Sequence, residues 1–244
     1  MIRFENVTFS RGGHTVLKEV SFFIGSNETV AVLGSSGEGK TTLLRLILRL
    51  LHPDSGRIFI DDLDITDLPE EKLASVRKKF SIVFQDGALF DSLTVRENVA
   101  FYFREFTNYT ENEIENHVRK LLGFVGVEEA IDLMPEELSG GMQRRVAIAR
   151  ALATRESKMF LYDEPTSDLD PLSADKICRL IKDLDGRERG FIVVTHAIPD
   201  ALRLARRFMF LKNSSILFDG TKEQMLNADI PDLRLFLSYW REIH

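Results

Sequence analysis

Residues 34–42, called the phosphate loop below, constrain the fold of this chain more than any other stretch. Their sequence, GSSGEGKTT, fits the pattern G-x-x-x-x-G-K-[ST] of a phosphate-binding turn. Glycines let the backbone curl until several N–H groups point at one anion, and the lysine adds a positive charge. An apolar run typical of a strand, 29–33, precedes the loop, and a helical pattern follows it. A helix N-terminus therefore faces the same anion, which favours a nucleotide site over a chance glycine turn.

The phosphate loop predicts a site for a nucleoside triphosphate and Mg²⁺. The residues assigned to nucleotide binding are Gly34, Ser35, Ser36, Gly37, Glu38, Gly39, Lys40, Thr41 and Thr42. The Lys40 ammonium group is placed to reach the β- and γ-phosphates. The Thr41 hydroxyl is a predicted ligand of Mg²⁺, a hard cation that prefers oxygen. In the helical pattern that follows, Arg45 and Arg49 are four residues apart and are expected on one exposed stripe.

Composition excludes several classes of protein. The 244 residues, 44% hydrophobic and 29% charged, are typical of a globular chain with a sizeable core. A formal net charge of −6 argues against a broad nucleic-acid surface, so no nucleic-acid partner is expected. No secretory leader is visible at the N-terminus, and no apolar run reaches the length of a membrane span. We therefore expect a cytoplasmic chain, for which any membrane role must come through a partner.

The order of the predicted elements indicates an α/β fold in a single domain, 1–244. Strand patterns occupy 2–23 and recur at 57–60, 80–84, 158–162, 191–195, 207–211 and 215–218, the last followed by a turn at Asp219 and Gly220. Charged helical patterns dominate the middle of the chain, where Thr94 and Thr110 each begin a capping box. We predict an α/β core with a β subdomain at 1–91 and 159–229, an inserted helical subdomain at 92–158 and a helical tail at 230–244. The single cysteine, Cys178, has an apolar helical context that favours a buried structural thiol.

A second glycine-rich helix start lies at residues 138–142, LSGGM, called the signature turn below. Ser139 is a natural N-cap, and Gly140 and Gly141 leave their N–H donors uncovered. Met142 completes the turn. The pattern predicts a second anion-attracting helix start, with an ordinary glycine-containing cap as the alternative.

Polar residues follow three of the predicted strands. Asp163 and Glu164 follow 158–162, where the first acid can hold Mg²⁺ through water and the second can take a proton from an attacking water. His196 ends the strand at 191–195, and Gln85 follows the strand at 80–84. Ligands collect at the carboxyl ends of parallel strands, which favours a shared site over exposed acids and a structural histidine.

Phe9 and the apolar face within 233–240 each have two possible interpretations. Phe9 precedes the phosphate loop at a distance that suits a flat face for a nucleotide base, or it is a core aromatic. Leu233, Phe236, Leu237 and Trp240 fall on one helical face. That face packs either on its own domain or on a partner.

Taken together, the phosphate loop, Gln85, the signature turn, the strand ending in Asp163 and Glu164, and His196 resemble the ATP-binding-cassette (ABC) ATPases over the whole chain. The resemblance implies a P-loop NTPase (RecA-like) core with an N-terminal antiparallel β subdomain and an inserted helical subdomain. It also implies that two copies pair head to tail, so that each ATP lies between the phosphate loop of one copy and the signature turn of the other.

The resemblance further implies a role for each motif residue. Glu164 polarises the attacking water, and His196 contacts the γ-phosphate. Gln85 reaches Mg²⁺ and senses the membrane partner. Phe9 matches the position that stacks on adenine, and Asp170 lies in the loop that crosses the dimer.

Three segments, 84–99, 134–146 and 231–237, look like those of the Mla-type phospholipid-trafficking ATPases. That likeness implies an integral membrane permease and an MCE-type lipid carrier as partners, with the permease docked at 87–90 and the chain on the cytoplasmic face of the membrane. The alternatives are the motor of a polar-solute importer of the amino-acid type and a soluble ABC ATPase without transport.

The chain departs from the family pattern at three positions. Asp168 replaces the small residue usual before the Leu-Asp of the dimer loop, and Ala197 replaces the acid that commonly follows the switch histidine. Glu38 brings a carboxylate into the phosphate loop, and its side chain is expected to point to solvent. None of these changes removes a catalytic group.

Overall fold

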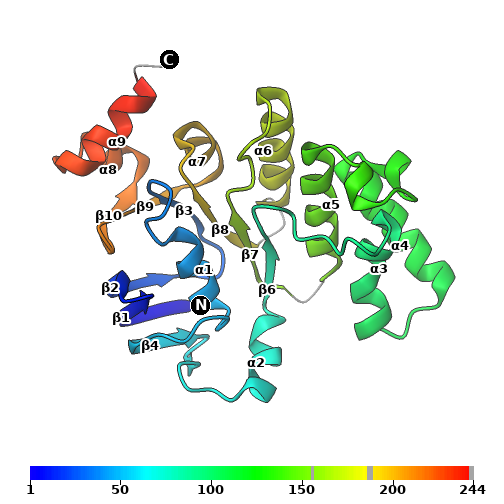
Figure 1. Cartoon of the computed structure of the whole chain (residues 1–244), viewed down its shortest axis with the longest axis horizontal. Coiled ribbons are helices and arrows are strands. Elements are labelled where there is room, and N and C mark those ends of the chain that lie inside the picture. The colour runs from blue at the N-terminus through cyan, green and yellow to red at the C-terminus, as the bar shows by residue number, and fades with distance from the viewer. Residues whose placement is uncertain (155–156, 186–188, 242–244) are drawn as a thin grey trace.

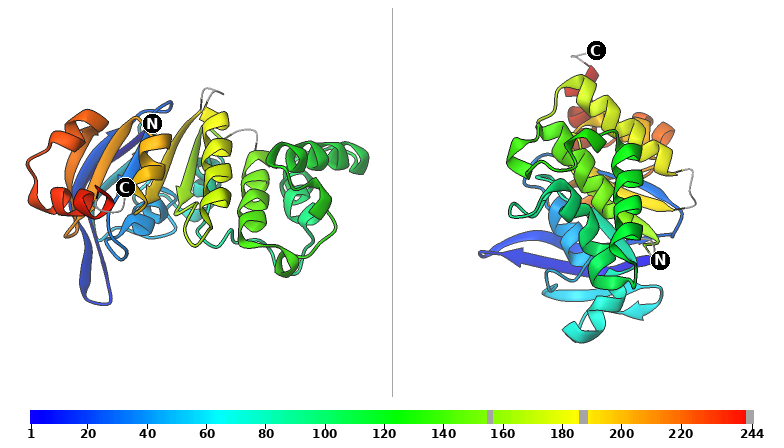
Figure 2. Two further views of the ribbon diagram at one scale, coloured as in Figure 1. Left: turned by 90° about the horizontal axis from the view of Figure 1, so that it is seen from above. Right: turned by 90° about the vertical axis from the view of Figure 1, so that its right-hand side faces the viewer.

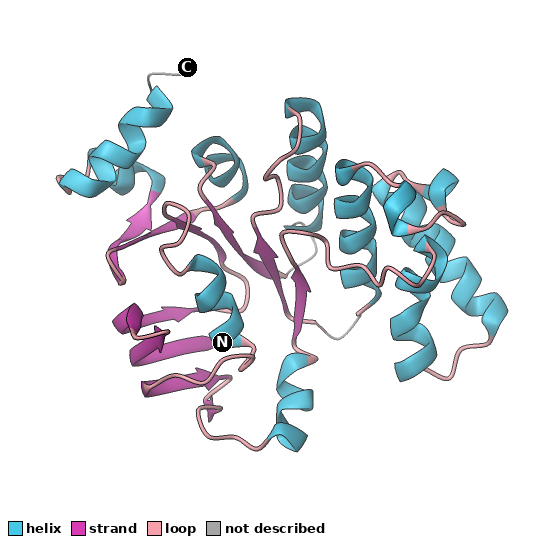
Figure 3. Cartoon of the chain, in the orientation of Figure 1, coloured by secondary structure: helices cyan, strands magenta, loops and turns pink. Residues whose placement is uncertain are grey.

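The strands form two sheets with helix α1 between them (Figures 1 and 3). The computed structural model describes residues 1–154, 157–185 and 189–241. The antiparallel sheet has the strand order β2-β1-β4-β5. Its strands are β1 (Ile2–Arg11), β2 (His14–Ile24), β4 (Ser55–Ile60) and β5 (Leu63–Asp64).

The second sheet, called the main sheet below, has the order β10-β9-β3-β8-β7-β6. Its strands are β3 (Thr29–Leu33), β6 (Phe80–Val83), β7 (Met159–Asp163), β8 (Gly190–Thr195), β9 (Arg207–Lys212) and β10 (Ser215–Thr221). In this order, each strand from β9 to β6 runs parallel to its neighbour. Strand β10 is an edge strand and pairs antiparallel with β9. Because helices or the other sheet cover both faces, β3, β7 and β8 are buried at every position.

Alternate residues of the main sheet pack into two different clusters. Val30 and Val32 of β3 face α1 (Lys40–Ile47) and the antiparallel sheet, whereas Ala31 and Leu33 face the opposite side. On that opposite side lie α6 (Pro171–Asp185) and α7 (Ile198–Leu204) (Figure 1). The main sheet is thus the middle layer of the core.

The remaining helices lie around this layered core. The three helices α3 (Val95–Phe106), α4 (Glu111–Val125) and α5 (Gly140–Ala153) stand together beyond β6, at the far end from the antiparallel sheet (Figure 2). Helix α2 (Glu70–Arg77) precedes β6, and α8 (Lys222–Asn227) and α9 (Pro231–Arg241) follow β10. Within the described ranges, no helix is both long and apolar enough to cross a membrane.

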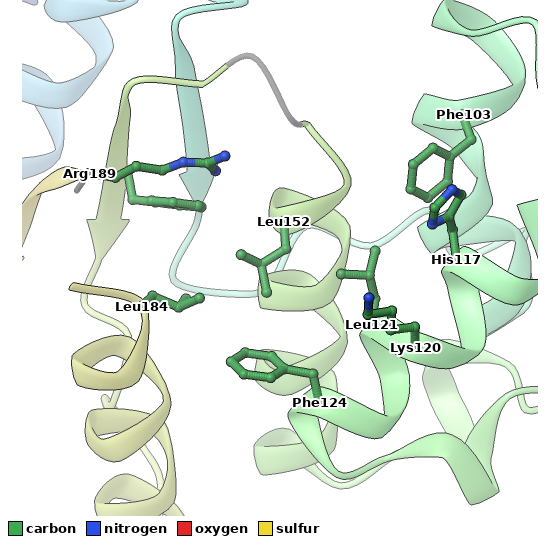
Figure 4. Close-up of a pocket in the computed structure, with 9 residues that line it drawn as sticks. Phe103, His117, Lys120, Leu121, Phe124, Leu152, Leu184 and Arg189 are labelled. Atoms are coloured by element: carbon green, nitrogen blue, oxygen red, sulfur yellow. The ribbon is translucent and has the colours of Figure 1, made fainter. Parts of the chain in front are cut away.

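The segment of helices α3 to α5 forms as the sequence pattern predicts. Thr94 and Thr110 make reciprocal capping boxes with Glu97 and Glu113 at the starts of α3 and α4. A cavity of about 220 Å³ lies where these helices meet α6 and β7, lined by side chains such as Phe124 (Figure 4). The predicted α/β class, with an antiparallel sheet and an inserted group of helices, is confirmed.

The exact bounds of the predicted subdomains stay a prediction. Residues 155–156, 186–188 and 242–244, which fall in the predicted helical subdomain, core and tail, lie outside the described residues.

Two local predictions were wrong. Helix α1 ends at Ile47, so Arg49 is not on its exposed stripe; the Arg49 φ is 50°, and its Nε donates to the Ile65 carbonyl oxygen at 2.9 Å. Asp219 and Gly220 lie inside β10 rather than in a turn, because their backbone continues the pairing with β9.

The structure also decides how the tail packs and confirms the predicted burial of Cys178. In α9, Leu233 and Leu237 are buried in the same cluster as the main sheet, and the Phe236 ring lies 5.2 Å from that of Phe210. The tail therefore packs on its own chain, while the side chain of Trp240 lies outside the described part. Cys178 is buried as predicted, and burial raises the pKa of its thiol to about 12.

Candidate functional site

The predicted site residues gather where the parallel strands end. The phosphate loop follows β3, Gln85 lies just after β6, Asp163 ends β7, and His196 follows β8. Strands β3, β8 and β7 are direct neighbours, and β6 is next to β7. Parallel pairing therefore places residues from four distant parts of the sequence together at the carboxyl ends of the main-sheet strands.

The phosphate loop is a compact turn held by its own lysine. The Lys40 Nζ donates to the carbonyl oxygens of Gly34, at 2.8 Å, and Ser35, at 3.0 Å. Gly37 and Gly39 have φ values of 85° and 99°, a left-handed backbone that favours glycine. At Gly39 a Cβ would also lie 2.9 Å from a Val16 methyl group of β2. The loop is thus wedged between the two sheets.

Lys40, Glu164 and His196 form a continuous polar chain. Lys40 Nζ lies 3.1 Å from Glu164 Oε1, and His196 Nδ1 lies 3.0 Å from Glu164 Oε2. The exposed fractions of the Lys40 and Glu164 side chains are 5% and 9%, whereas that of His196 is 53%. Glu164 is therefore a shielded carboxylate shared between a buried cation and an accessible imidazole.

The backbone of Glu164 is also unusual. Its φ is 45°, a left-handed conformation that costs free energy for a residue other than glycine. Its N–H donates to the Val194 carbonyl oxygen at 2.9 Å, and its carboxylate accepts from the His196 N–H at 3.3 Å. Contacts with the β8 end thus hold the carboxylate in place.

Asp163 and Thr41 meet at the same strand ends. The Thr41 hydroxyl donates to Asp163 Oδ1 at 2.8 Å. Burial raises the pKa of Asp163, while the Thr41 hydrogen bond opposes that rise. Two oxygen donors are therefore adjacent, as the predicted Mg²⁺ site requires, whereas Gln85 is exposed and has no contact that fixes its amide in the described part of the structure.

The signature turn lies apart from the phosphate loop within one chain. Ser139 caps α5, with its Oγ accepting from the Met142 N–H at 3.3 Å, and both Ser139 and Gly140 are exposed. A Cβ at Gly141 would lie 3.1 Å from Ser173 Oγ of α6. Among the described residues, no hydrogen bond or ion pair joins this turn to the phosphate loop. The expected pairing of the two turns thus requires a second chain.

Asp170 is a capping residue of α6 in this structure. Its Oδ1 accepts from the N–H groups of Leu172 and Ser173, each at 3.0 Å. A hydrogen bond with the Ser173 side chain, together with these backbone bonds, lowers the pKa of its carboxyl group. Ser173, which these bonds help to hold, approaches Gly141 of the signature turn, whereas the Leu172 side chain is exposed.

The sequence interpretation missed Arg144, which joins three of the motifs. Its side chain is 7% exposed; Nη1 donates to the Phe84 carbonyl oxygen at 3.3 Å, and Nη2 lies 3.5 Å from Ser167 Oγ. Its Nε has no hydrogen-bond partner, and burial lowers the pKa of its guanidinium, while Asp86 and Asp168 act in the opposite direction. The unusual Asp168 thus contributes a compensating negative charge. Two arginines in succession after the signature turn were the only sequence signal.

Two expectations about individual side chains need correction. Glu38 does not point to solvent, because its carboxylate forms an ion pair with Lys212 at 2.6 Å and is only 16% exposed. Phe9 is 7% exposed and belongs to the cluster around α1, which favours the core reading over a free face for adenine.

Comparison with known proteins supports the family resemblance over nearly the whole chain. The sequence model of the ABC transporter family matches residues 17–167. The chain is 39% identical over 236 residues to the intermembrane phospholipid transport system ATP-binding protein MlaF of Haemophilus influenzae, covering 96% of this chain and 88% of that protein. It is 40% identical over 235 residues to the glutamine transport ATP-binding protein GlnQ of Escherichia coli, covering 96% and 97%.

Among solved structures, the fold resembles the dimeric ATP-binding cassette MJ0796 in a post-hydrolysis state bound to ADP and Pi. The TM-score is 0.83 at 33% identity, and the match covers 91% of this chain and 98% of that one.

The buried ion pair leads to a stability prediction for the protein without nucleotide. Replacing Lys40 by Met keeps most of the side-chain volume but leaves Glu164 as a buried carboxylate without its cation. We expect Lys40→Met to lower the free energy of unfolding by about 3 kcal/mol, as for other buried pairs that lose one partner. Urea unfolding followed by circular dichroism measures this change.

A double variant separates the charge effect from lost packing. Adding Glu164→Gln to Lys40→Met removes the unpaired charge and should restore most of the lost stability. Lys176→Met, at an exposed position of α6, serves as the control and should be neutral. Equal stability of the Lys40→Met variant and the wild type would contradict the prediction.

Proposed function

This chain belongs to the ABC transporter family and is an ATP-hydrolysing subunit, and we propose that it drives phospholipid movement between membranes. The observation that carries the mechanism is the chain in which the buried Lys40–Glu164 pair contacts the accessible His196 imidazole, at the carboxyl ends of the main-sheet strands. The proposal on the substrate rests on the likeness to MlaF over 96% of the chain. A polar-solute importer, favoured by the similar identity to GlnQ, is the second candidate.

ATP binding would exchange the partners of Lys40. Without nucleotide, Lys40 neutralises Glu164 at 3.1 Å. A triphosphate in the loop offers more negative charge and becomes the stronger partner for the ammonium group. Glu164 then loses its cation, and its carboxylate is free to accept a hydrogen bond from the attacking water. In this mechanism Lys40 binds the phosphates and also controls the general base.

The donor set fits a magnesium ion that arrives with the nucleotide. In the described residues no cluster of three or more His, Cys, Asp or Glu side chains could hold a metal by itself. Thr41 and Asp163 instead offer a hydroxyl and a carboxylate 2.8 Å apart, which suits an ion bound mainly by phosphates and water. Gln85 would complete this set. When bound, Mg²⁺ neutralises charge that develops on the phosphates.

Glu164 and His196 act on the water and the γ-phosphate. Glu164 takes a proton from the attacking water, and its left-handed backbone holds the carboxylate at the strand end. Since His196 Nδ1 faces Glu164, its exposed ring can contact the γ-phosphate on the other side. The bond between the two side chains fixes their relative orientation.

The active site is completed by a second copy of the chain. The signature turn exposes Ser139 and Gly140 at a helix start, and the dimeric MJ0796 cassette is the structural relative reported above. Placing that helix start against the γ-phosphate encloses the charge between two sets of donors and excludes water, which strengthens every electrostatic term. Closure of the dimer would then depend on ATP, and hydrolysis would release it.

A groove beside the site offers a docking place for the membrane permease. It has a volume of about 390 Å³, and its lining includes Phe84, Ala88, Phe90, Phe101, Tyr102 and Arg150. The centres of the Phe90 and Phe101 rings are 5.0 Å apart, and the two residues are 43% and 40% exposed. An exposed aromatic patch of this kind is typical of a partner site. A permease bound there would hold the chain on the cytoplasmic face of the membrane.

Arg150 connects this groove to the signature turn. Its guanidinium donates to the carbonyl oxygens of Gly87, at 3.0 Å, and Ala88, at 2.7 Å, and lies 5.5 Å from the centre of the Phe90 ring. Arg150 belongs to α5, whose first turn follows Ser139. Movement of the groove segment would therefore be transmitted along a single helix to the half-site offered to the partner cassette.

The general-base role of Glu164 is tested by its isosteric amide. Glu164→Gln should retain ATP binding and lower the turnover number by about 10²–10⁴-fold, the usual contribution of a positioned base. Phosphate release and nucleotide titration of the purified chain measure the two quantities. A variant with near-normal turnover would remove Glu164 from this role.

The two-chain site is tested at the signature turn. Ser139→Arg places a bulky side chain between the cassettes, so hydrolysis should be abolished while ATP binding to the isolated chain remains intact. Ser26→Arg, exposed in the loop before β3, is the matched control and should hydrolyse ATP normally. If a purified monomer still hydrolyses ATP with Ser139→Arg, the site does not require a second copy.

The substrate and the docking groove are tested together by purification in mild detergent. The wild-type chain should copurify with an integral membrane permease and an MCE-domain protein identified by mass spectrometry. Recovery of a periplasmic solute receptor instead would support the polar-solute importer, and the absence of any membrane protein would support a non-transport ATPase.

Variants locate that contact on the molecule. Phe90→Asp with Phe101→Asp should abolish copurification and leave the ATPase activity of the isolated chain unchanged, because these rings lie outside the nucleotide site. Phe23→Asp, at a 53% exposed position of β2, is the control and should copurify normally. Unaltered copurification of the Phe90 and Phe101 double variant would place the permease elsewhere.

A further inference from the structure

The carboxylate of the phosphate loop is held by the turn between β9 and β10. Glu38 Oε1 lies 2.6 Å from Lys212 Nζ, and Glu38 Oε2 accepts from the Asn213 N–H at 2.9 Å. Lys212 is the last residue of β9, and Glu38 raises the pKa of its ammonium group. The fifth residue of the loop is thus bound, through its side chain, to an element that follows it by more than 170 residues.

A free carboxylate at this position would oppose nucleotide binding. The loop presents N–H groups and Lys40 to a triphosphate, whereas Glu38 adds a negative charge within the same turn. Like charges only a few ångströms apart repel strongly where protein limits access of water. The ion pair with Lys212 neutralises this charge, and the two bonds to the β9–β10 turn restrict where the carboxylate can lie.

The turn that holds Glu38 is itself well fixed. Asn213 and Ser214 both have left-handed backbones, with φ values of 51° and 66°. Ser214 accepts from the Lys18 N–H at 2.8 Å through its carbonyl oxygen, and its hydroxyl donates to the Thr15 carbonyl oxygen at 2.8 Å. The turn is therefore anchored to β2 as well as to the phosphate loop.

The end of β9 also touches the start of the loop. A Cβ on Gly34 would lie 2.5 Å from the Leu211 carbonyl oxygen, a contact that excludes any side chain there. Gly34 and Glu38, the first and fifth residues of the loop, are thus both in contact with the end of β9 or the turn after it. Such a double contact fixes the curvature of the loop before any nucleotide arrives.

We propose that Lys212 is a positioning residue for ATP binding, which neutralises Glu38 and holds the phosphate loop open for the β- and γ-phosphates. This role rests on the proposed binding of ATP by that loop. It gives Lys212 a function through Glu38 rather than through contact with the nucleotide. The departure of Glu38 from the family pattern and the presence of Lys212 then form a matched pair.

A double-mutant cycle tests this dependence on Glu38. Lys212→Met should raise the dissociation constant for AMPPNP with Mg²⁺ about tenfold, because the carboxylate then repels the phosphates without compensation. In a Glu38→Ser background the same change should raise it less than about twofold, since no carboxylate remains to be neutralised. Isothermal titration calorimetry on the full chain measures all four constants.

Ionic strength separates this role from a loss of structure. The weakening caused by Lys212→Met should shrink as salt rises from about 0.05 M to about 0.5 M, because salt screens the repulsion. Lys222→Met, at an exposed position of α8, is the matched control and should bind AMPPNP like the wild type. Thermal unfolding of each variant shows that the chain remains folded.

Two outcomes would overturn the inference. An equal effect of Lys212→Met in both backgrounds would show that Lys212 acts independently of Glu38, and an unchanged dissociation constant would show that it does not act at all. Both are distinct from failure of the proposed nucleotide site, in which the wild-type chain itself would not bind AMPPNP.

Discussion

The site depends first on the parallel hydrogen-bond ladder that joins β3, β8 and β7. In that register Leu33 pairs with Thr195, and Val194 pairs with Asp163, so the three strands end at nearly the same level. The residues that follow, including Glu164 and His196, must therefore leave the sheet side by side. A shift of one register step would turn their side chains to opposite faces and separate the groups that form the ion pair.

The ladder brings together charges that would be costly to bury alone. Lys40 and Glu164 are each less than 10% exposed, and each is stabilised because the other is 3.1 Å away. In the proposed mechanism, the phosphates of ATP take the place of Glu164 as the partner of Lys40. A single interaction thus connects the stability of the free protein to the chemistry proposed for ATP hydrolysis.

The other half of the proposed site is prepared at a distance. The signature turn is capped by Ser139, backed by α6 at Gly141 and joined through Arg150 to the exposed groove beside Phe90. These contacts do not reach the phosphate loop of the same chain. They hold the start of α5 exposed, as the proposed pairing with a second cassette requires, while the groove near the other end of α5 is also exposed.

The sequence by itself determined the local chemistry: the phosphate loop, the caps at Thr94, Thr110 and Ser139, and the apolar strands that end in polar residues. Spacing and residue type specify such features because they depend on short-range backbone geometry. Only the tertiary structure decided that Glu38 binds Lys212, that Arg144 is buried among three motifs and that Phe9 lies in the core. Those outcomes depend on which distant segments meet, and the packing of the whole chain sets that, since no local pattern records the partner of a buried charge.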